Sequence, residues 1–298
     1  MFTGCGTALV TPFQKDGSLD ELAMRSLVRR QIDAGINFLV PCGTTGESPT
    51  LSRKEHLRVV ELTLAEAKGK VPVLAGAGGY NTAEVIELAH ELVRLGADGI
   101  LSVTPYYNKP TQEGLFQHYS AIASEVPVPI IVYSVQSRTG CNVEPQTLRR
   151  LSEIKNIIGV KEASGNISQM ASVVHQVPAH FLVLSGDDAL TIPLIALGGR
   201  GIISVVSNEI PAEMARLARL ALANDFAGAR EIQRKYFPLM EINFVESNPQ
   251  PVKAAMALMG LLEPVWRLPM VPPSEANTAK IGKVLDTLGL TVRSVHAS

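Results

Sequence analysis

Short apolar runs recur along the chain from its first residues. Eight of them have the length and the apolar, β-branched composition of strands buried on both faces. They span Gly6–Thr11, Phe38–Cys42, Val71–Ala75, Gly99–Thr104, Pro129–Ser134, Ile157–Glu162, Phe181–Ser185 and Gly201–Val206. We therefore predict a sheet whose strands are spread over most of the chain.

Longer amphipathic segments lie between these runs, among them Asp20–Ala34, Arg53–Lys68, Thr82–Leu95 and Gln112–Glu125. In the last of these, Leu115, Tyr119 and Ile122 recur at the spacing of one helix face. We expect capping boxes at Ser18-x-x-Glu21, Ser52-x-x-Glu55 and Asn81-x-x-Glu84. Strand and helix alternating eight times is typical of an α/β chain closed into a (β/α)8 TIM barrel. An open, doubly wound sheet is the alternative, but it needs no eighth repeat.

The pattern changes after the eighth strand. Four predicted helices follow with no strand between them, namely Pro211–Ala223, Ala227–Phe237, Pro251–Leu262 and Ser274–Leu288. We expect the first to close the barrel and the other three to form a C-terminal helical extension. The predicted units are a catalytic barrel over residues 1–224 and a helical region over residues 225–298, without a low-complexity linker.

Lys161 ends the sixth predicted strand, after the apolar run Ile157-Ile-Gly-Val160. An amine at such a strand end is poorly hydrated, which favours its neutral form. A neutral amine can attack a ketone and form a Schiff base. Taken alone, a lysine that reaches past the strand end to solvent is the commoner explanation.

Three further features lie at the same end of the predicted barrel as Lys161, because the C-terminal ends of barrel strands share one rim. Tyr133 ends the fifth strand, Gly43-Thr-Thr-Gly-Glu47 follows the second, and Pro105-Tyr-Tyr-Asn-Lys-Pro110 follows the fourth. Each also has a simpler explanation: a strand aromatic, an ordinary turn, or a cover for apolar surface or an oligomer contact. Two glycines around two hydroxyls, however, expose successive amides that suit a carboxylate. The convergence of these features with Lys161 predicts an active site at this rim.

Asp187 and Asp188, which follow the seventh strand, could be mistaken for metal ligands. No histidine or third carboxylate accompanies them, so we expect one of the two to cap the next helix. The sequence therefore predicts no metal site.

Composition and charge narrow the function further. At 298 residues and 46% hydrophobic composition, the chain can bury one large core. Its 27 Lys and Arg balance 28 Asp and Glu, which argues against binding to nucleic acid or to an anionic membrane. No apolar run reaches the roughly 18 residues of a membrane span, and the N-terminal pattern is not that of a signal peptide. Cys5, Cys42 and Cys141 are odd in number and unclustered, so we expect a reduced, cytoplasmic protein.

With these residues in view, the chain resembles the dihydrodipicolinate synthase and N-acetylneuraminate lyase family of class I aldolase-type barrels. The resemblance runs from Gly4-x-Gly-Thr-Ala-Leu-Val-Thr-Pro12 to about Leu290. Its specific motifs are Gly43-Thr-Thr-Gly-Glu47, Tyr133 with Gly159-Val-Lys-Glu162, and Ser185-Gly-Asp187. Three further segments resemble the synthase branch of the family rather than the lyase branch: Val103-Thr-Pro-Tyr-Tyr-Asn-Lys-Pro110, Arg138-Thr-Gly140 and Asn248-Pro-Gln-Pro-Val-Lys253.

The resemblance implies a role for each matching position. Lys161 would form the Schiff base with pyruvate, and Tyr133 would move protons through Thr44 and through Tyr107 of the partner subunit. Thr44 and Thr45 would hold the pyruvate carboxylate. Arg138 would hold the carboxylate of L-aspartate-4-semialdehyde, a task suited to a planar guanidinium. The implied substrate-binding positions are Thr45, Arg138, Gly186 and Ile203.

The implied reaction yields 4-hydroxy-tetrahydrodipicolinate, in the lysine (diaminopimelate) pathway, and requires no metal or organic cofactor. One segment departs from the family pattern, which reads Tyr-Asn-x-Pro where this chain has Tyr133-Ser-Val-Gln136. Without the proline, we expect a less organised loop before Arg138. The alternative is therefore a pyruvate-dependent aldolase that acts on another 2-keto acid or a sugar acid. A third possibility is a barrel that only binds pyruvate-like ligands, against which the intact set of candidate catalytic residues argues.

The resemblance also implies an assembly and a regulatory site. We expect a homotetramer, as a dimer of dimers, in which Tyr106 and Tyr107 lie at a subunit interface. Where relatives bind lysine at that interface, this chain keeps Ser48, His56, Glu84 and Tyr106 as candidate regulatory residues. It departs at Arg53 and Tyr80, where lysine-sensitive relatives often have histidine and asparagine. Because Arg53 adds positive charge near a cationic ligand, we expect weak or absent inhibition by lysine.

Overall fold

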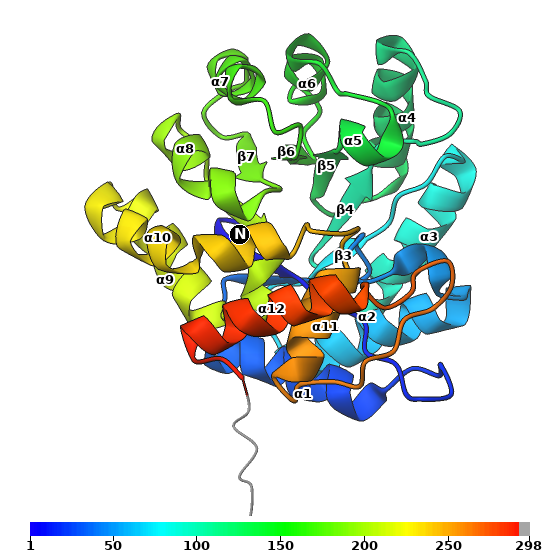
Figure 1. Ribbon diagram of the computed structural model, residues 1–298. Coiled ribbons are helices and arrows are strands. Elements are labelled where there is room, and N and C mark those ends of the chain that lie inside the picture. The colour runs from blue at the N-terminus through cyan, green and yellow to red at the C-terminus, as the bar shows by residue number, and fades with distance from the viewer. Residues whose placement is uncertain (292–298) are drawn as a thin grey trace, which may run out of the picture.

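Eight parallel strands form one barrel with helices packed around it, which confirms the predicted (β/α)8 fold (Figure 1). This computed structural model describes residues 1–291, so residues 292–298 of the predicted helical region lie outside the described part. The strands follow the order β2-β1-β8-β7-β6-β5-β4-β3, and a bridge between Leu39 and Val73 joins its two ends. Their bounds are β1 Gly4–Ala8, β2 Phe38–Val40, β3 Leu74–Gly76, β4 Gly99–Val103, β5 Ile130–Ser134, β6 Ile157–Glu162, β7 Leu182–Ser185 and β8 Gly201–Ser204.

The predicted strand limits needed correction where apolar residues continue outside the hydrogen-bonded ladder. The first strand spans Gly4–Ala8 instead of Gly6–Thr11. The third strand begins at Leu74, three residues after the predicted start at Val71. Residues Leu9–Thr11 are buried without being paired as a strand. Apolar character reports burial, whereas a strand requires backbone pairing as well.

Helices separate the strands and surround them. Their bounds are α1 Glu21–Asp33, α2 Arg53–Ala67, α3 Thr82–Leu95, α4 Gln112–Glu125, α6 Pro145–Leu151, α7 Ile167–Gln176, α8 Thr191–Ala196 and α9 Pro211–Leu222, with short helical turns η1 Ser48–Thr50, α5 Gln136–Thr139, η2 Asp188–Leu190 and η3 Val206–Asn208. The capping box at Ser52 and Glu55 is confirmed. The one expected at Ser18 is wrong, because Asp20 caps α1 while the Ser18 hydroxyl bonds to Asp16. At Asn81 the side chain caps α3 by accepting from the Ala83 N–H, but the reciprocal half of the box does not form. Glu84 instead accepts from the side-chain amide of Asn81.

Three further helices follow the barrel: α10 Phe226–Ile242, α11 Gln250–Leu258 and α12 Glu275–Leu288. The predicted end of α10 at Phe237 is wrong, because the helix continues through Pro238 to Ile242. A proline removes one hydrogen bond within a helix, and packing of α10 on α9 and α12 supports the turns beyond it.

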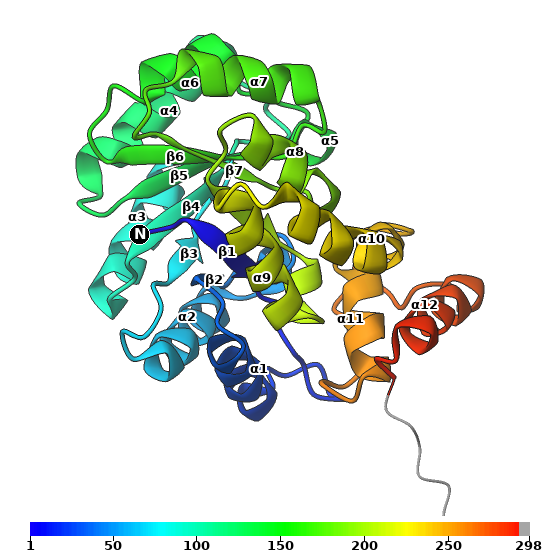
Figure 2. The same cartoon turned by 90° about the vertical axis from the view of Figure 1, so that its left-hand side faces the viewer.

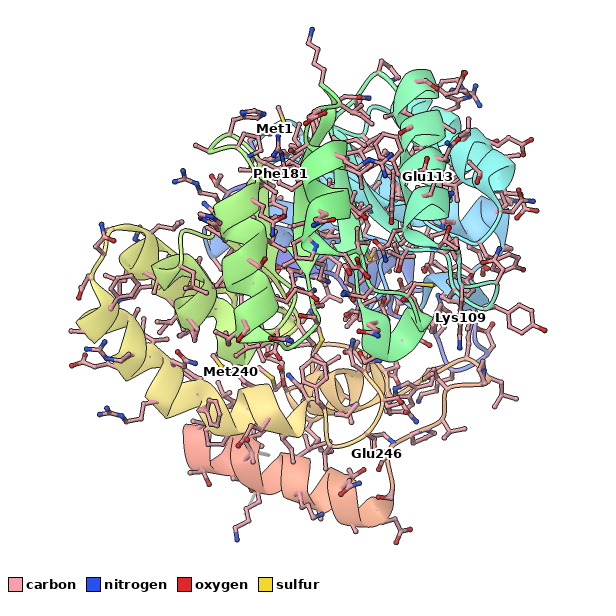
Figure 3. The ribbon with its side chains drawn as sticks, turned by 90° about the horizontal axis from the view of Figure 1, so that it is seen from above. Met1, Lys109, Glu113, Phe181, Met240 and Glu246 are labelled. Carbon is pink, nitrogen blue, oxygen red and sulfur yellow. The ribbon has the colours of Figure 1, made fainter. Side chains whose placement is uncertain are left out.

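The C-terminal helices lie at the end of the barrel toward which the strands point (Figure 2). Met1 and Phe181, each just before a strand, lie at the opposite end from Glu246 (Figure 3). The extension is thus placed beside the rim where the predicted chemistry converges. The boundary at residue 224 stays a prediction, and buried contacts described below cross it.

Two apolar layers hold the barrel together. One fills the space between the strands and the surrounding helices, and the other fills the barrel interior. Within the interior, Phe2 and Phe38 pack edge to face with their ring centroids 5.5 Å apart. Among residues 1–291, no helix has the length and apolarity to cross a membrane.

Candidate active site

Lys161 and Tyr133 are neighbours on adjacent strands. β5 and β6 pair in parallel with Tyr133 directly opposite Lys161. The Lys161 Nζ lies 4.2 Å from the centroid of the Tyr133 ring, and the two side chains are 5% and 6% exposed. Within residues 1–291, Nζ takes part in no hydrogen bond or ion pair. An unpaired amine is thus held against the ring of a tyrosine inside the barrel.

Gly186 and Ile203 are the two remaining substrate-binding positions that the resemblance implies. A Cβ atom at Gly186 would lie 3.1 Å from Lys161 Cε and 2.6 Å from Ala163 Cβ, so a larger residue would displace the lysine. Ile203 is fully buried in the apolar cluster of the barrel interior, which also contains Tyr133. The structure therefore brings Gly186 against the Lys161 side chain and Ile203 into the interior cluster that contains Tyr133.

Glu162 follows Lys161 but faces the other side of the sheet, because side chains alternate along a strand. Its carboxylate accepts from Gln169 Nε2 at 2.8 Å and from the Ser164 N–H at 3.3 Å. Burial raises the pKa of Glu162, and these hydrogen bonds lower it in part. Glu162 belongs to the packing between the barrel and α7 rather than to the site around Lys161.

Thr44 and Thr45 form the corner of a tight turn after β2. The Gly46 N–H donates to the Gly43 carbonyl at 3.1 Å across this corner. Within residues 1–291, the backbone N–H groups of Thr44 and Thr45 donate to no protein acceptor. Successive free amides of this kind form a concave site for an anion such as a carboxylate. Thr44 lines the open cavity, whereas Thr45 is 2% exposed and lies behind it.

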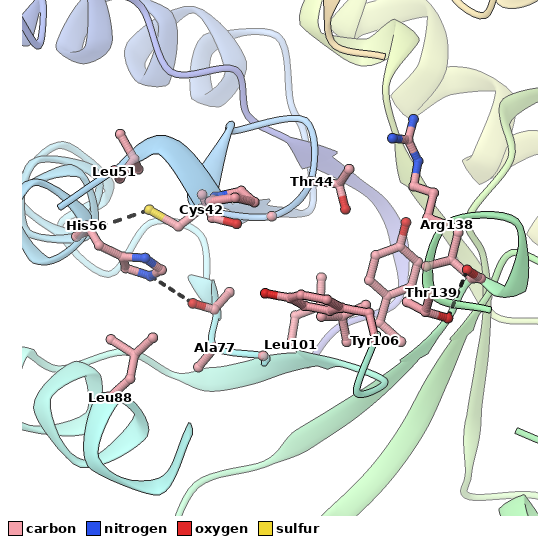
Figure 4. Close-up of a pocket in the computed structure, with 18 of the residues that line it drawn as sticks. Cys42, Thr44, Leu51, His56, Ala77, Leu88, Leu101, Tyr106, Arg138 and Thr139 are labelled. Atoms are coloured by element: carbon pink, nitrogen blue, oxygen red, sulfur yellow. Dashed lines mark hydrogen bonds between the residues drawn. The ribbon is translucent and has the colours of Figure 1, made fainter. Parts of the chain in front are cut away.

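Arg138 lies on α5, the short helix after β5, and its side chain reaches over the cavity (Figure 4). Side-chain hydrogen bonds hold the loop before Arg138, where this chain lacks the family's proline, and its degree of order stays a prediction. Buried Thr139 accepts from the Thr104 hydroxyl at 3.0 Å and from the Cys141 N–H at 3.2 Å. Ser134 accepts from the Val143 N–H at 3.1 Å and so closes the base of the loop. Side-chain hydrogen bonds supply the constraint that a proline would otherwise give.

Comparison with known proteins agrees with this arrangement. Residues 1–288 match the model of the Dihydrodipicolinate synthetase family. The chain belongs to this family. It is 54% identical over 288 residues to the 4-hydroxy-tetrahydrodipicolinate synthase of Koribacter versatilis, with 96% of each chain covered.

Solved structures of the family superpose closely. Dihydrodipicolinate synthase from Thermotoga maritima gives a TM-score of 0.95 at 46% identity, covering 97% of this chain and 99% of that one. The chloride-inhibited dihydrodipicolinate synthase from Acinetobacter baumannii, complexed with pyruvate, gives 0.96 at 41% identity and covers 97% and 100%. The predicted membership of the dihydrodipicolinate synthase family is confirmed.

The rim that carries the candidate residues opens into a cavity of about 490 Å³. Thr44 and Arg138 lie toward one end, His56 toward the other, and Tyr106 between them (Figure 4). Lys161 itself does not line this cavity, whereas Tyr133, whose ring centroid lies 4.2 Å from the Lys161 Nζ, does.

Three of the four candidate regulatory residues line the far part of this cavity: Ser48, His56 and Tyr106. Glu84 does not line the cavity. Burial raises the pKa of Tyr106, and the nearby Tyr80 and Glu84 side chains raise it further. His56 Nε2 lies 2.8 Å from the Gly76 carbonyl, and burial lowers the His56 pKa. The structure thus places these residues together and leaves their regulatory role a prediction.

Tyr107 is not brought into the site of its own chain. Tyr107 is 91% exposed and has a positive φ of 68°. Tyr106 instead packs edge to face with Tyr80, with ring centroids 5.1 Å apart. A catalytic role for Tyr107 therefore depends on a neighbouring subunit.

Sequence analysis identified the motif around Asn248 but assigned no role to its residues. Asn248 Nδ2 donates to Thr45 Oγ1 at 2.9 Å, and its carbonyl accepts from Arg138 Nη2 at 3.2 Å. Lys253 forms a fully buried ion pair with Glu47 at 2.5 Å. The only signal in the sequence was the motif itself, because the contacts join residues 110 to 206 positions apart.

Asp187 and Asp188 have separate roles. Asp187 caps η2 by accepting from the Ala189 N–H, which confirms the capping prediction for that residue. Asp188 is buried and accepts from the Ser204 hydroxyl and from the N–H groups of Val205 and Val206. Burial raises the pKa of Asp188 to about 6. Within residues 1–291, no cluster of three or more histidine, cysteine or acidic side chains could hold a metal ion.

Proposed function

We propose that this protein is a 4-hydroxy-tetrahydrodipicolinate synthase, a lyase that condenses pyruvate with L-aspartate-4-semialdehyde through a Schiff base on Lys161. The observation that carries the proposal is the buried, unpaired Lys161 amine held 4.2 Å from the Tyr133 ring, beside free backbone amides at Thr44 and Thr45. Membership of the family and the name of the Koribacter relative support the same reaction.

The first half of the reaction uses Lys161. Its amine attacks the ketone of pyruvate and expels one water to give an imine, while the Thr44–Thr45 amides and hydroxyls hold the carboxylate. The imine withdraws electrons from the adjacent methyl group, which loses a proton to form an enamine. Tyr133, beside the amine, is placed to receive and return protons. The relative from Acinetobacter baumannii, solved with pyruvate, supports this choice of first substrate.

The second half uses Arg138. Its guanidinium stands over the cavity and would bind the carboxylate of the semialdehyde in a bidentate manner. The enamine carbon attacks the aldehyde and leaves a hydroxyl there. The amino group of the semialdehyde then attacks the imine carbon and displaces Lys161, which closes the ring and restores the free amine. Atoms balance, because the only molecule released besides the product is water.

Assembly and location complete the proposal. An exposed Tyr107 supports a homotetramer in which Tyr107 of the partner subunit relays protons to Tyr133. The three cysteines are free and buried, which fits a reducing cytoplasm.

Two measurements test the function. Borohydride added with pyruvate should attach one label, on Lys161, as mapped by peptide mass spectrometry; a label elsewhere, or none, contradicts the Schiff base. Condensation rates over a panel of aldehydes should be fastest with L-aspartate-4-semialdehyde. A faster sugar-derived aldehyde would favour the alternative aldolase and would leave the Lys161 result intact.

A further inference from the structure

Asn248, which lies between α10 and α11, is one of the residues through which the C-terminal extension contacts the rim. Asn248 is 4% exposed, although it lies about 110 positions from Arg138 and about 200 from Thr45. Its side chain bonds to Thr45 and its backbone carbonyl bonds to Arg138. These are the two residues to which the proposed function gives the two substrate carboxylates.

The direction of the bond to Thr45 is what matters chemically. A threonine hydroxyl has one hydrogen to donate and two lone pairs that accept. Because the Asn248 amide donates, it occupies a lone pair of Thr45 Oγ1 and leaves the hydroxyl hydrogen free. Within residues 1–291, that hydrogen has no protein acceptor. The hydroxyl hydrogen is therefore available to donate to an anion.

The bond to Arg138 holds the guanidinium that is proposed to bind the carboxylate of the second substrate. Arg138 Nη2 donates to the Asn248 carbonyl, and the guanidinium keeps its other N–H groups for a ligand. An exposed arginine loses conformational entropy when it binds, and a fixed contact at one nitrogen reduces that loss.

The geometry points to Asn248 as a positioning residue that presents the Thr45 hydroxyl as a donor and anchors the Arg138 guanidinium. This inference rests on the proposed function, and it deepens that function by naming the residue that couples the two carboxylate sites. Asn248 acts through Thr45 and Arg138 and does not touch the reacting atoms.

The decisive variant is Asn248→Asp, which keeps the shape but replaces the donating NH2 by an acceptor. The Thr45 hydroxyl then donates to the new carboxylate and is lost to the substrate. We expect the KM for pyruvate to rise about tenfold or more, as for loss of one hydrogen bond to a charged group. The KM for the semialdehyde should rise less than threefold, since the backbone carbonyl that holds Arg138 remains.

A double-mutant cycle separates positioning from general damage. In a Thr45→Val background the hydroxyl is absent, so Asn248→Asp should change the pyruvate KM less than twofold further. Gln250→Glu is the matched control, because it makes the same amide-to-acid change two residues on, where Nε2 donates to the Val271 carbonyl at 2.7 Å. Both KM values of that control should stay within about twofold of the parent protein.

The outcomes are distinct. Unchanged KM values in Asn248→Asp, or an equal effect with and without the Thr45 hydroxyl, would overturn the inference while a labelled Lys161 leaves the proposed function standing. If Asn248→Asp only loosened the fold, the fraction of active protein and thus kcat would fall while both KM values stayed the same. That result would also contradict the inference. Absence of pyruvate labelling in the parent protein would instead show that the proposed function itself is wrong.

Discussion

At the scale of single residues, the site depends on groups that have been left without partners. In the part of the chain that the structure describes, the Lys161 amine and the backbone amides of Thr44 and Thr45 have no protein partner, although most buried polar groups in proteins are paired. Nearby polar groups of similar burial, such as Thr139 and Ser134, are fully engaged in local hydrogen bonds. The free groups are therefore the ones available to a ligand.

Tyr133→Phe tests the proton transfer assigned to this side chain. The change removes the hydroxyl but keeps the ring beside Lys161, so the imine with pyruvate should still form and be trapped by borohydride. Turnover should fall by roughly 10²- to 10⁴-fold, as expected for loss of a general acid–base group. Tyr119→Phe is the matched control, because its buried hydroxyl bonds to the Ser102 carbonyl at 3.1 Å, away from Lys161. A turnover loss of the same size in both variants would contradict the assignment.

Asp188 makes stability depend on pH. Its folded pKa of about 6 exceeds the ordinary value of 3.8, so between these two values the folded protein binds more protons than the unfolded chain. The free energy of unfolding should therefore fall as the pH rises through this window, by about 3 kcal/mol in order of magnitude. Asp188→Asn should remove that contribution. Urea unfolding of both proteins at several pH values between 4 and 7 measures the difference, and parallel curves would be contrary to expectation.

At the scale of elements, the strands and their order along the rim followed from the sequence. Apolar runs bounded by turn residues identified all eight strands, because parallel strands buried on both faces carry such runs. The same pattern placed Lys161 and Tyr133 at strand ends, and Thr44 and Arg138 in the segments that follow the second and fifth strands. The bounds of α6, α7 and α8 could not be predicted, since six to ten residues hold too few turns to show a helical period.

The contacts of Asn248 and Lys253 could not be predicted from the sequence. Each joins segments far apart in the chain, and no local pattern encodes which buried polar groups meet. The same holds for Thr139, whose hydroxyl organises the Arg138 loop in place of a proline. Local patterns determine elements, whereas tertiary packing selects the partners of buried polar side chains.

Arg53, at the start of α2, carries the prediction about lysine. It lines the far part of the cavity, where its charge opposes a cationic ligand. Glu91 of α3 accepts from Arg53 Nε at 2.6 Å, which moderates that repulsion without removing it. Assays at saturating pyruvate with rising L-lysine should show weak or no inhibition, and Arg53→Gln should increase it. Strong inhibition of the parent protein at submillimolar lysine would refute the prediction.

At the scale of the whole molecule, one chain holds an incomplete set of the proposed catalytic residues. Lys161, Tyr133 and Thr44 belong to one site, while Tyr107 is exposed. We predict a homotetramer by light scattering at assay concentrations, and a fully active monomer would argue against it. Tyr107→Phe should slow turnover and leave the thermal unfolding midpoint unchanged. Tyr80→Phe is a suitable control, because it alters an exposed ring beside Tyr106 and no proposed catalytic group.

The buried pair of Glu47 and Lys253 has a consequence for the order in which the protein is made. The two residues are 206 positions apart, so a growing chain carries Glu47 long before the ribosome has added its partner. Burying that carboxylate alone would be strongly unfavourable. The turn that contains Thr44 and Thr45 can therefore reach its folded conformation only when synthesis is nearly finished. A nascent chain that stops short of Lys253 would have all eight strands and Lys161, yet would lack a settled place for the carboxylate of its first substrate.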